Sequence, residues 1–164
     1  MKRIWAPWRK VYILGKKPKA GCFFCNDIRA PRSKDPKNLL LHRARHSFIV
    51  MNRYPYTDAH LMIVPFRHVK SLDQLKDKEK LELLDLLTLS QKLLTKTFKP
   101  HGFNIGINMG KAAGAGIPDH IHLHMVPRWL GDTNFMPVTS GAKVISDSLD
   151  SSYQHLKRVL KTLK

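Results

Sequence analysis

The chain has 164 residues, of which 43% are hydrophobic, and 29 Lys and Arg against 12 Asp and Glu give a formal net charge of +17. This composition suits one globular domain with its own core, and no apolar run is long enough for a membrane span or a secretory signal. We therefore expect a single domain over residues 1–164 in a soluble, cytoplasmic protein that does not contact membranes.

The positive charge favours polyanions such as nucleic acid or polyphosphate as partners. The basic residues are dispersed along the chain and form no recognition-helix or Arg-Gly-aromatic motif. Nucleic-acid binding therefore stays an alternative that the sequence does not favour.

The first third of the chain contains the first predicted elements. Residues 1–21 hold two prolines and two glycines and predict an irregular N-terminal arm. A short helix is expected over residues 22–30 and a polar loop over 31–38. Runs rich in β-formers then predict two strands, at 47–52 and 60–65, which the loop between them joins as an antiparallel pair.

The second half of the chain predicts helices and two more strands. Leucines at spacings of three and four indicate a helix between residues 71 and 98, with a capping box at Ser71–Gln74 and a main helix that begins at Asp77. Strands are expected at 103–109 and 119–127, followed by a loop over 130–143 and a C-terminal helix over 144–163. This order predicts an α+β domain with an antiparallel sheet.

Three histidines alternate with apolar residues in the last of these strands, at His120, His122 and His124. Strict alternation predicts that their imidazoles point to one face. The small residues at 110–116 that precede them suggest a phosphate cradle made of backbone N–H groups. Phosphoryl or nucleotidyl transfer through a covalent histidine fits this arrangement. A three-histidine metal centre and plain surface histidines are the competing interpretations.

The chain has two cysteines, Cys22 and Cys25. A Cys-x-x-Cys pair in an intracellular protein suggests metal or redox chemistry rather than a disulfide. A structural zinc site usually has four protein ligands, so two more would come from elsewhere, most often from histidine.

These motifs together resemble the histidine-triad superfamily of nucleotide hydrolases and transferases. Residues 120–126 match its His-φ-His-φ-His-φ-φ motif, where φ is apolar, and residues 58–65 are similar to its Gly-His-aliphatic-Pro strand, with Ala59 in place of the common glycine. The cysteine pair resembles its N-terminal zinc pair, and residues 127–135 resemble the branch of bacterial diadenosine-polyphosphate phosphorylases and related hydrolases. The resemblance implies a sheet of about five strands, one long helix packed on it and a C-terminal helix.

The resemblance also implies a role for each site residue. His122 would be the nucleophile that becomes nucleotidylated, with a backbone carbonyl near His120 holding it in the reactive tautomer, and His124 would contact the phosphate or the leaving-group oxygen. The implied nucleotide-binding residues are Asn52 at the ribose, Asn108, Ala115 and Gly116 at the phosphates, and Trp129 near the nucleotide or its leaving group.

In zinc-binding members the metal is structural, and the matching positions here are Cys22, Cys25, His68 and His120. His60 would then be a histidine that supports the site residues from behind or packs beside them. The resemblance gives no role to His42, His46, His101 and His155, for which solvent exposure is expected. Family members usually form homodimers, so a homodimer is implied as well.

The implied activity is cleavage of the α-phosphate linkage of dinucleoside polyphosphates, such as diadenosine tetraphosphate, through a covalent nucleotidyl-histidine. Gly116 stands where many hydrolases carry Gln or Ser, so a side chain that could help bind phosphate is missing. We therefore expect water as the acceptor, with inorganic phosphate as a close alternative. A member directed to nucleic-acid adenylates, or a zinc-stabilised nucleotide-binding protein without catalysis, are the further alternatives.

Overall fold

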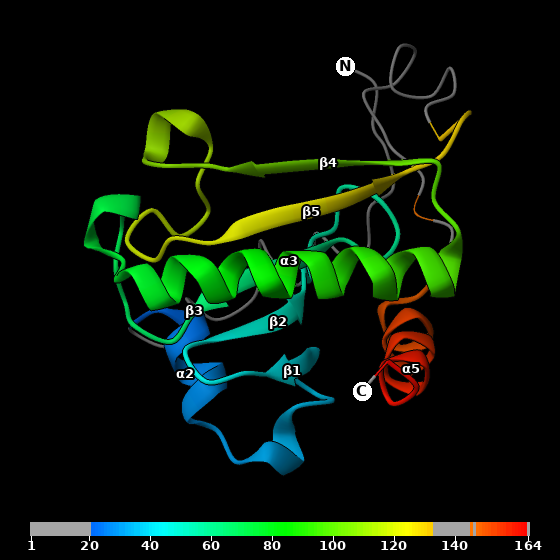
Figure 1. The fold of residues 1–164 in the computed structure, drawn as a ribbon, viewed down its shortest axis with the longest axis horizontal. Coiled ribbons are helices and arrows are strands. Elements are labelled where there is room, and N and C mark those ends of the chain that lie inside the picture. Colours follow the sequence, from blue (N-terminus) through cyan, green and yellow to red (C-terminus); the bar gives the residue numbers. More distant parts are fainter. Residues whose placement is uncertain (1–20, 133–144, 146, 164) are drawn as a thin grey trace, which may run out of the picture.

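The computed structural model describes residues 21–132, 145 and 147–163. Their strands form one antiparallel sheet in the order β1-β2-β3-β5-β4 (Figure 1). The α+β class and the sheet of about five strands are confirmed. The predicted arm over 1–21 and loop over 130–143 lie almost wholly outside the described residues. The strands are β1 (Leu40–Arg43), β2 (Ser47–Met51), β3 (Leu61–Pro65), β4 (Gly102–Ile107) and β5 (Leu123–Arg128).

Three α-helices and three short 3-10 turns complete the described part. The long helix α3 lies across one face of the sheet, and α5 lies beside the end of α3 and next to β1 (Figure 1). None of these helices combines the length and apolar character that crossing a membrane would need. The helices are α2 (Phe23–Arg29), α3 (Asp77–Phe98) and α5 (Leu149–Leu160), and the turns are η1 (Arg32–Lys34), η2 (Leu72–Gln74) and η3 (Lys111–Ala113).

The sheet has an apolar core on each face. Neighbouring residues of a strand point to opposite faces, so each strand contributes to both cores. On the helix face, Ile49 and Ile63 pack with leucines of α3 and α5. On the other face, Phe48 and Val64 pack with Phe24 of α2. We call this second side the α2 face; the candidate functional site lies on it.

The main helix α3 begins at Asp77 as predicted, but its cap differs from the prediction. Ser71 makes no capping bond with its side chain, and a 3-10 turn follows it. The backbone N–H of Lys76 instead donates to Glu79 Oε2 over 2.8 Å. Glu79 also pairs with Arg67, at 2.8 Å from its Nε, so one carboxylate binds both the start of α3 and the segment that directly follows β3.

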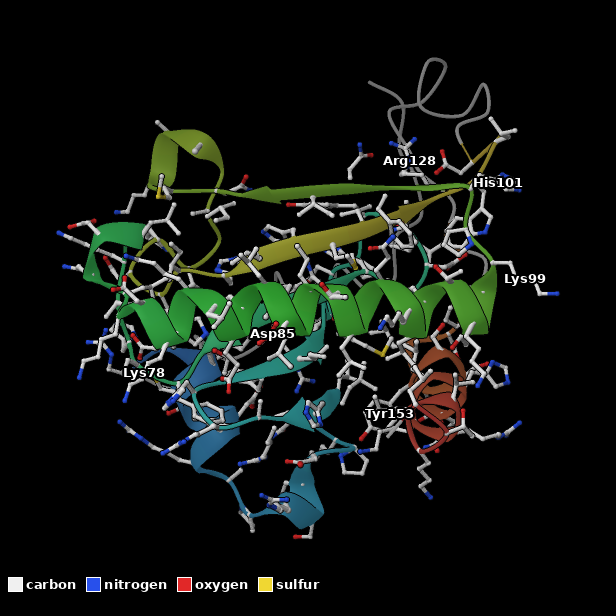
Figure 2. All side chains as sticks on the ribbon, viewed as in Figure 1. Lys78, Asp85, Lys99, His101, Arg128 and Tyr153 are labelled. Atoms are coloured by element: carbon white, nitrogen blue, oxygen red, sulfur yellow. The ribbon has the colours of Figure 1, made fainter. Side chains whose placement is uncertain are left out.

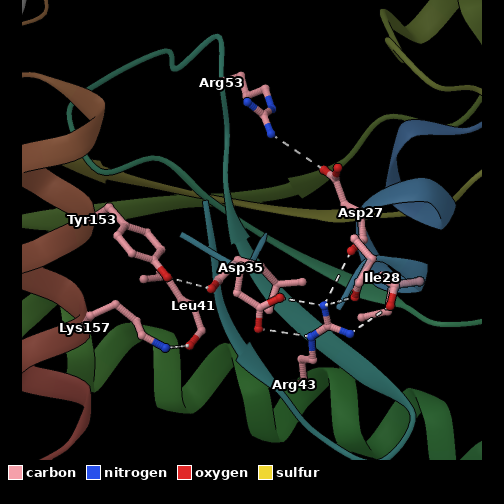
Figure 3. A network of polar contacts seen from close by, with 10 residues as sticks. Asp27, Ile28, Asp35, Leu41, Arg43, Arg53, Tyr153 and Lys157 are labelled. Carbon is pink, nitrogen blue, oxygen red and sulfur yellow. Dashed lines mark hydrogen bonds and ion pairs between the residues drawn. The ribbon is translucent and has the colours of Figure 1, made fainter. Parts of the chain in front are cut away.

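The sequence missed β1, a four-residue edge strand. Its carbonyls are satisfied from α5, where the Tyr153 hydroxyl donates to Leu40 O over 3.1 Å and Lys157 Nζ donates to Leu41 O over 3.0 Å. Figures 2 and 3 show Tyr153 directed from α5 toward this strand. Helix α5 therefore covers an edge that would otherwise be open to pairing.

Strand β5 starts at Leu123, so the prediction of a strand over 119–127 is wrong in its first part. The backbone N–H of Ile121 donates to Val69 O over 2.7 Å, in the segment that follows β3. This bond draws the chain before Leu123 away from the regular ladder. The predicted C-terminal helix over 144–163 is likewise shorter and spans Leu149–Leu160.

Candidate functional site

Four histidines are buried together on the α2 face. His60, His120, His122 and His124 are exposed by 0%, 1%, 5% and 9% respectively. The rings of His122 and His124 lie 4.8 Å apart, and those of His60 and His124 lie 5.1 Å apart. The apolar residues between the triad histidines, Ile121 and Leu123, belong to the core on the helix face. The prediction that the three imidazoles share one face therefore holds, although only His124 lies within β5.

The hydrogen bonds of His122 fix its tautomer. Its Nδ1 lies 2.8 Å from the carbonyl oxygen of His120. A carbonyl only accepts, so Nδ1 carries the proton and Nε2 keeps its lone pair. Burial lowers the pKa of His122, against the opposing effect of this hydrogen bond, so the ring is neutral near pH 7. A buried, neutral imidazole with a free nitrogen is a competent nucleophile.

His60 and His124 form a directed pair. The backbone N–H of Tyr56 donates to His60 Nδ1 over 3.2 Å, and Asn52 Nδ2 lies 3.3 Å from the same nitrogen. The proton of His60 is therefore on Nε2, which lies 2.9 Å from His124 Nδ1. His124 in turn carries its proton on Nε2, as a donor available to a ligand. Burial, followed by the neighbouring histidines, lowers the pKa of His60 to about 3 and that of His124 to about 4.

Sequence reasoning gave His60 a role in supporting the site residues or in packing, and it assigned no role to Tyr56. The ring of Tyr56 lies 4.8 Å from His60 and 5.9 Å from His124, and the residue is 52% exposed. The alternation of side chains along β3 was the available signal for His60. His60 lies two residues before Met62, so both point to the same face, and Met62 pairs with His124. The proximity of Tyr56 depends on the loop conformation, which the sequence pattern did not indicate.

The four predicted metal ligands come together. Cys22, Cys25, His68 and His120 place their ligand atoms within 4.8 Å of one another. His120 Nδ1 lies 3.2 Å from Cys22 Sγ, and His68 Nδ1 lies 3.4 Å from Cys25 Sγ. His120 Nε2 donates to Pro65 O over 2.9 Å, so its Nδ1 lone pair is directed at the thiols. Two sulfur and two nitrogen donors at this separation fit a tetrahedral cation such as zinc.

Helix α2 brings the cysteines to this place. Cys22 is its N-cap residue and Cys25 lies in its first turn. At the other end, the Arg43 guanidinium donates to the carbonyls of Ile28 and Ala30, at 2.8 and 3.2 Å, and pairs with Asp35 through two bonds (Figure 3). Arg43 thereby fixes the C-terminal end of α2 to strand β1.

Three of the predicted nucleotide-binding residues lie in or beside the small-residue loop. Asn108 directly follows β4, and its Nδ2 lies 4.0 Å from the position that a Cβ would take on Gly114, so its side chain is directed to the loop. Within the loop, Gly114 and Ala115 donate their N–H groups to the carbonyls of Lys111 and Gly110. A Cβ on Gly116 would meet no atom within 4 Å, so the space beside Gly116 is open.

Asn52 joins the histidine cluster, whereas Trp129 does not. Besides its contact with His60, Asn52 accepts a hydrogen bond from the Tyr54 N–H over 2.9 Å. The indole of Trp129 donates to Phe98 O of α3 over 3.2 Å, which places it on the helix side of the sheet. Of the four histidines without a role, His101 and His155 are exposed as expected, and His42 and His46 are half-buried.

A cavity of about 710 Å³ lies on this helix side, at the C-terminal ends of α3 and β5. Its described lining includes Thr97, Phe98, Trp129 and His155, and none of the four buried histidines. This cavity and the clustered imidazoles therefore belong to different parts of the described structure.

Comparisons with known proteins agree with this geometry. A family model described as the HIT domain matches residues 33–129. The chain is 35% identical over 154 residues to a protein of Mycobacterium tuberculosis named AP-4-A phosphorylase, covering 91% of this chain and 79% of the relative. It is 31% identical over 93 residues, 57% of this chain and 50% of the relative, to a bis(5'-nucleosyl)-tetraphosphatase [asymmetrical] of Schizosaccharomyces pombe.

A solved structure of a zinc-bound histidine triad family protein from Mycobacterium smegmatis has the same fold. Its TM-score to this chain is 0.69 at 23% identity, and the match covers 87% of this chain and 95% of that one. At this level of identity the likeness concerns the fold.

Proposed function

This chain belongs to the HIT-domain family, and from that premise we propose that it is a nucleotide-processing enzyme that cleaves dinucleoside polyphosphates at the α-phosphate. One observation carries the proposal most directly, namely the bond from His122 Nδ1–H to the His120 carbonyl. It leaves Nε2 of a buried, neutral imidazole free to attack phosphorus.

In the proposed first step, His122 Nε2 forms a bond to the α-phosphorus, and the bond from that phosphorus to the bridging oxygen breaks. With diadenosine tetraphosphate, ATP leaves and AMP stays on His122. The Nε2–H of His124, fixed through His60, donates to a phosphate or leaving-group oxygen and offsets the charge that develops there. In the second step an acceptor oxygen attacks the same phosphorus, and the bond to His122 breaks.

Further residues are proposed to bind the nucleotide. Asn52 would meet the ribose, and Asn108 with the backbone N–H of Gly116 would meet the phosphates. Ala115 would shape the loop beside them, because its own N–H bonds to the Gly110 carbonyl. Trp129 is not part of this proposal, because its indole hydrogen-bonds to α3 on the opposite side of the sheet.

The metal ligands are proposed to hold a structural Zn²⁺ outside the chemistry. A cation bound by Cys22, Cys25, His68 and His120 would supply rigidity, because all four donors would be used in a closed tetrahedral site. No step of the proposed reaction passes through it.

The acceptor distinguishes two candidate activities. The missing side chain at Gly116 favours water, whereas the longer match to a protein named as a phosphorylase favours inorganic phosphate. The test is to incubate the purified protein with diadenosine tetraphosphate, with and without phosphate, and to identify the products. ADP that forms only with phosphate indicates a phosphorylase, and AMP with ATP indicates a hydrolase.

The His122→Ala variant is expected to lose turnover in either case, because no other nitrogen of the cluster has the same free position. His155→Ala, on the exposed side of α5, serves as the matched control and should retain activity. Wild-type turnover by His122→Ala would rule out the covalent mechanism. If no nucleotide were cleaved by the metal-replete protein, a non-catalytic binding role would replace the proposed one.

We also propose a homodimer, as the family resemblance implies. Strand β4 lies at the edge of the described sheet, and Ile105 on it is 51% exposed. On α3, Leu81 and Leu84 are exposed by 62% and 58%. Light scattering should therefore give about twice the chain mass of 18.9 kDa, and a monomer at all concentrations would contradict the proposal.

A further inference from the structure

We infer that Phe24 is a positioning residue, through which occupancy of the Cys22–Cys25–His68–His120 cluster fixes the ring of His122. The inference rests on the proposed function for the identity of the nucleophile. It adds a link between two parts of the site that the proposed reaction keeps separate.

The first connection runs through His120. Its ring nitrogen Nδ1 faces the thiols, at 3.2 Å from Cys22 and 3.6 Å from Cys25. Its backbone carbonyl accepts the His122 Nδ1–H over 2.8 Å. One residue is thus both a metal ligand and the group that sets the tautomer of His122. A cation that holds the His120 ring also restrains the carbonyl on the same residue.

The second connection runs through Phe24, which stands between the two cysteines. Its ring is 1% exposed and lies 5.4 Å from His120 and 5.1 Å from His122, at interplanar angles of 73° and 58°. These distances are typical of tilted and edge-to-face contacts between aromatic rings. The Phe24 ring therefore packs against the His122 ring, and it belongs both to the core of the α2 face and to the segment between the two thiols.

Helix α2 has little stability of its own to keep Phe24 in place. It has seven residues, far fewer than a helix needs to form alone in water. Arg43 holds its C-terminal end, but its N-cap residue, Cys22, makes no capping bond with its side chain. The N-terminal end of α2, where Phe24 lies, is thus held by the packing of Phe24 in the core and by the cysteine and histidine ligands. Without the cation, the Phe24 contact and the His120 carbonyl would lose their common restraint.

The first test compares Phe24→Leu with Phe23→Leu in the full-length, zinc-loaded protein. Phe23 is adjacent and 37% exposed, so its variant is the matched control. The measurements are zinc per chain, the nitrogen-15 NMR signals of the His122 ring, and kcat and KM for diadenosine tetraphosphate. We expect Phe24→Leu to retain one zinc, to broaden or shift the His122 Nδ1–H signal, and to lower kcat roughly tenfold or more with little change in KM.

Unchanged His122 signals and unchanged kcat in zinc-loaded Phe24→Leu would overturn the inference. If that variant loses zinc, Phe24→Met, which is nearer in volume, replaces it with the same expected results. If no variant, including the wild type, cleaves a nucleotide, the proposed function fails. The His122 signals still decide whether Phe24 positions the ring.

The second test removes and restores the metal in the wild-type protein. A chelator should abolish the ordered His122 Nδ1–H signal, and added Zn²⁺ should restore it, while circular dichroism monitors the fold. An unchanged signal in folded, metal-free protein would contradict the inference. If the metal-free protein unfolds, the Phe24 variants decide the question.

Discussion

The hydrogen-bond partner of each buried histidine decides which of its ring nitrogens carries the proton. His122 faces a carbonyl and keeps Nε2 free, whereas His124 faces His60 and presents Nε2–H. The motif predicted His122 and His124 as the reacting pair, but it did not predict the link to His60. That link is a diagonal contact between β3 and β5, and a diagonal contact depends on register, which the sequence of one strand does not contain.

Burial of His60 makes the stability of the fold dependent on pH. Its pKa in the folded state is about 3, against 6.5 when exposed, chiefly because of burial. Between these values the unfolded chain binds a proton that the folded chain does not, so stability should fall as the pH is lowered. Urea unfolding at about pH 7 and about pH 5 measures this loss, and His60→Gln should lose less stability than the wild type over that interval. An equal loss in both proteins would contradict the assignment.

Ala59 stands where the family commonly has glycine, and its backbone has a φ of 55°. A left-handed conformation costs an L-residue about 1–2 kcal/mol, whereas glycine adopts it freely but loses more entropy on folding. Ala59→Gly should therefore raise the free energy of unfolding by up to about 1 kcal/mol. The control is Ala30→Gly, at a φ of −65°, which should give no gain in the same denaturant titration.

At the scale of elements, the sequence predicted α3 and the two strands β2 and β3 closely. It missed β1 and began β5 too early, because alternation does not show where the hydrogen-bonded ladder begins. His120 lies in a bend and His122 in irregular backbone, and both come before the ladder, where Ile121 bonds to Val69 instead. The four-residue strand β1 carries too short a pattern to be separated from a loop.

Replacement of Arg43 is expected to lower the free energy of unfolding more than replacement of an exposed arginine nearby. Its guanidinium serves Asp35 and three carbonyls at the end of α2, while its side chain is only 13% exposed. Arg43→Met leaves these acceptors without their donor and should lower the free energy of unfolding by about 2–4 kcal/mol. Arg45→Met, at an exposed position, should change it by less than about 0.5 kcal/mol. Similar values for both variants in urea unfolding would show that the network contributes little.

At the scale of the whole molecule, the strand order could not be predicted from the sequence. Strand β5 lies between β3 and β4, and that placement joins His60 to His124. The metal cluster could be proposed only by resemblance, because Cys22 and His120 are 98 residues apart in the chain. Periodicity identifies elements and their buried faces, but the meeting of distant elements depends on tertiary packing.

The net charge of +17 is also a property of the whole chain. Dispersed cations bind DNA through counterion release, without reading its sequence. Fluorescence anisotropy with a random-sequence duplex should show binding at about 50 mM salt that is nearly lost at about 200 mM. Retention of tight binding at the higher salt concentration would instead favour a nucleic-acid substrate. A poly-anionic competitor such as heparin should displace the DNA at low salt.

The cover that α5 places over β1 also limits how copies of this protein can join. A sheet with two free edges can add neighbours on both sides and grow into a fibre. Here Tyr153 and Lys157 occupy two carbonyls of β1 at one edge, so β4 is the less covered edge of the described sheet. Two copies that paired along β4 would present only covered edges outward. Edge-to-edge growth would stop at a pair, and the C-terminal helix would act as a terminator of polymerisation.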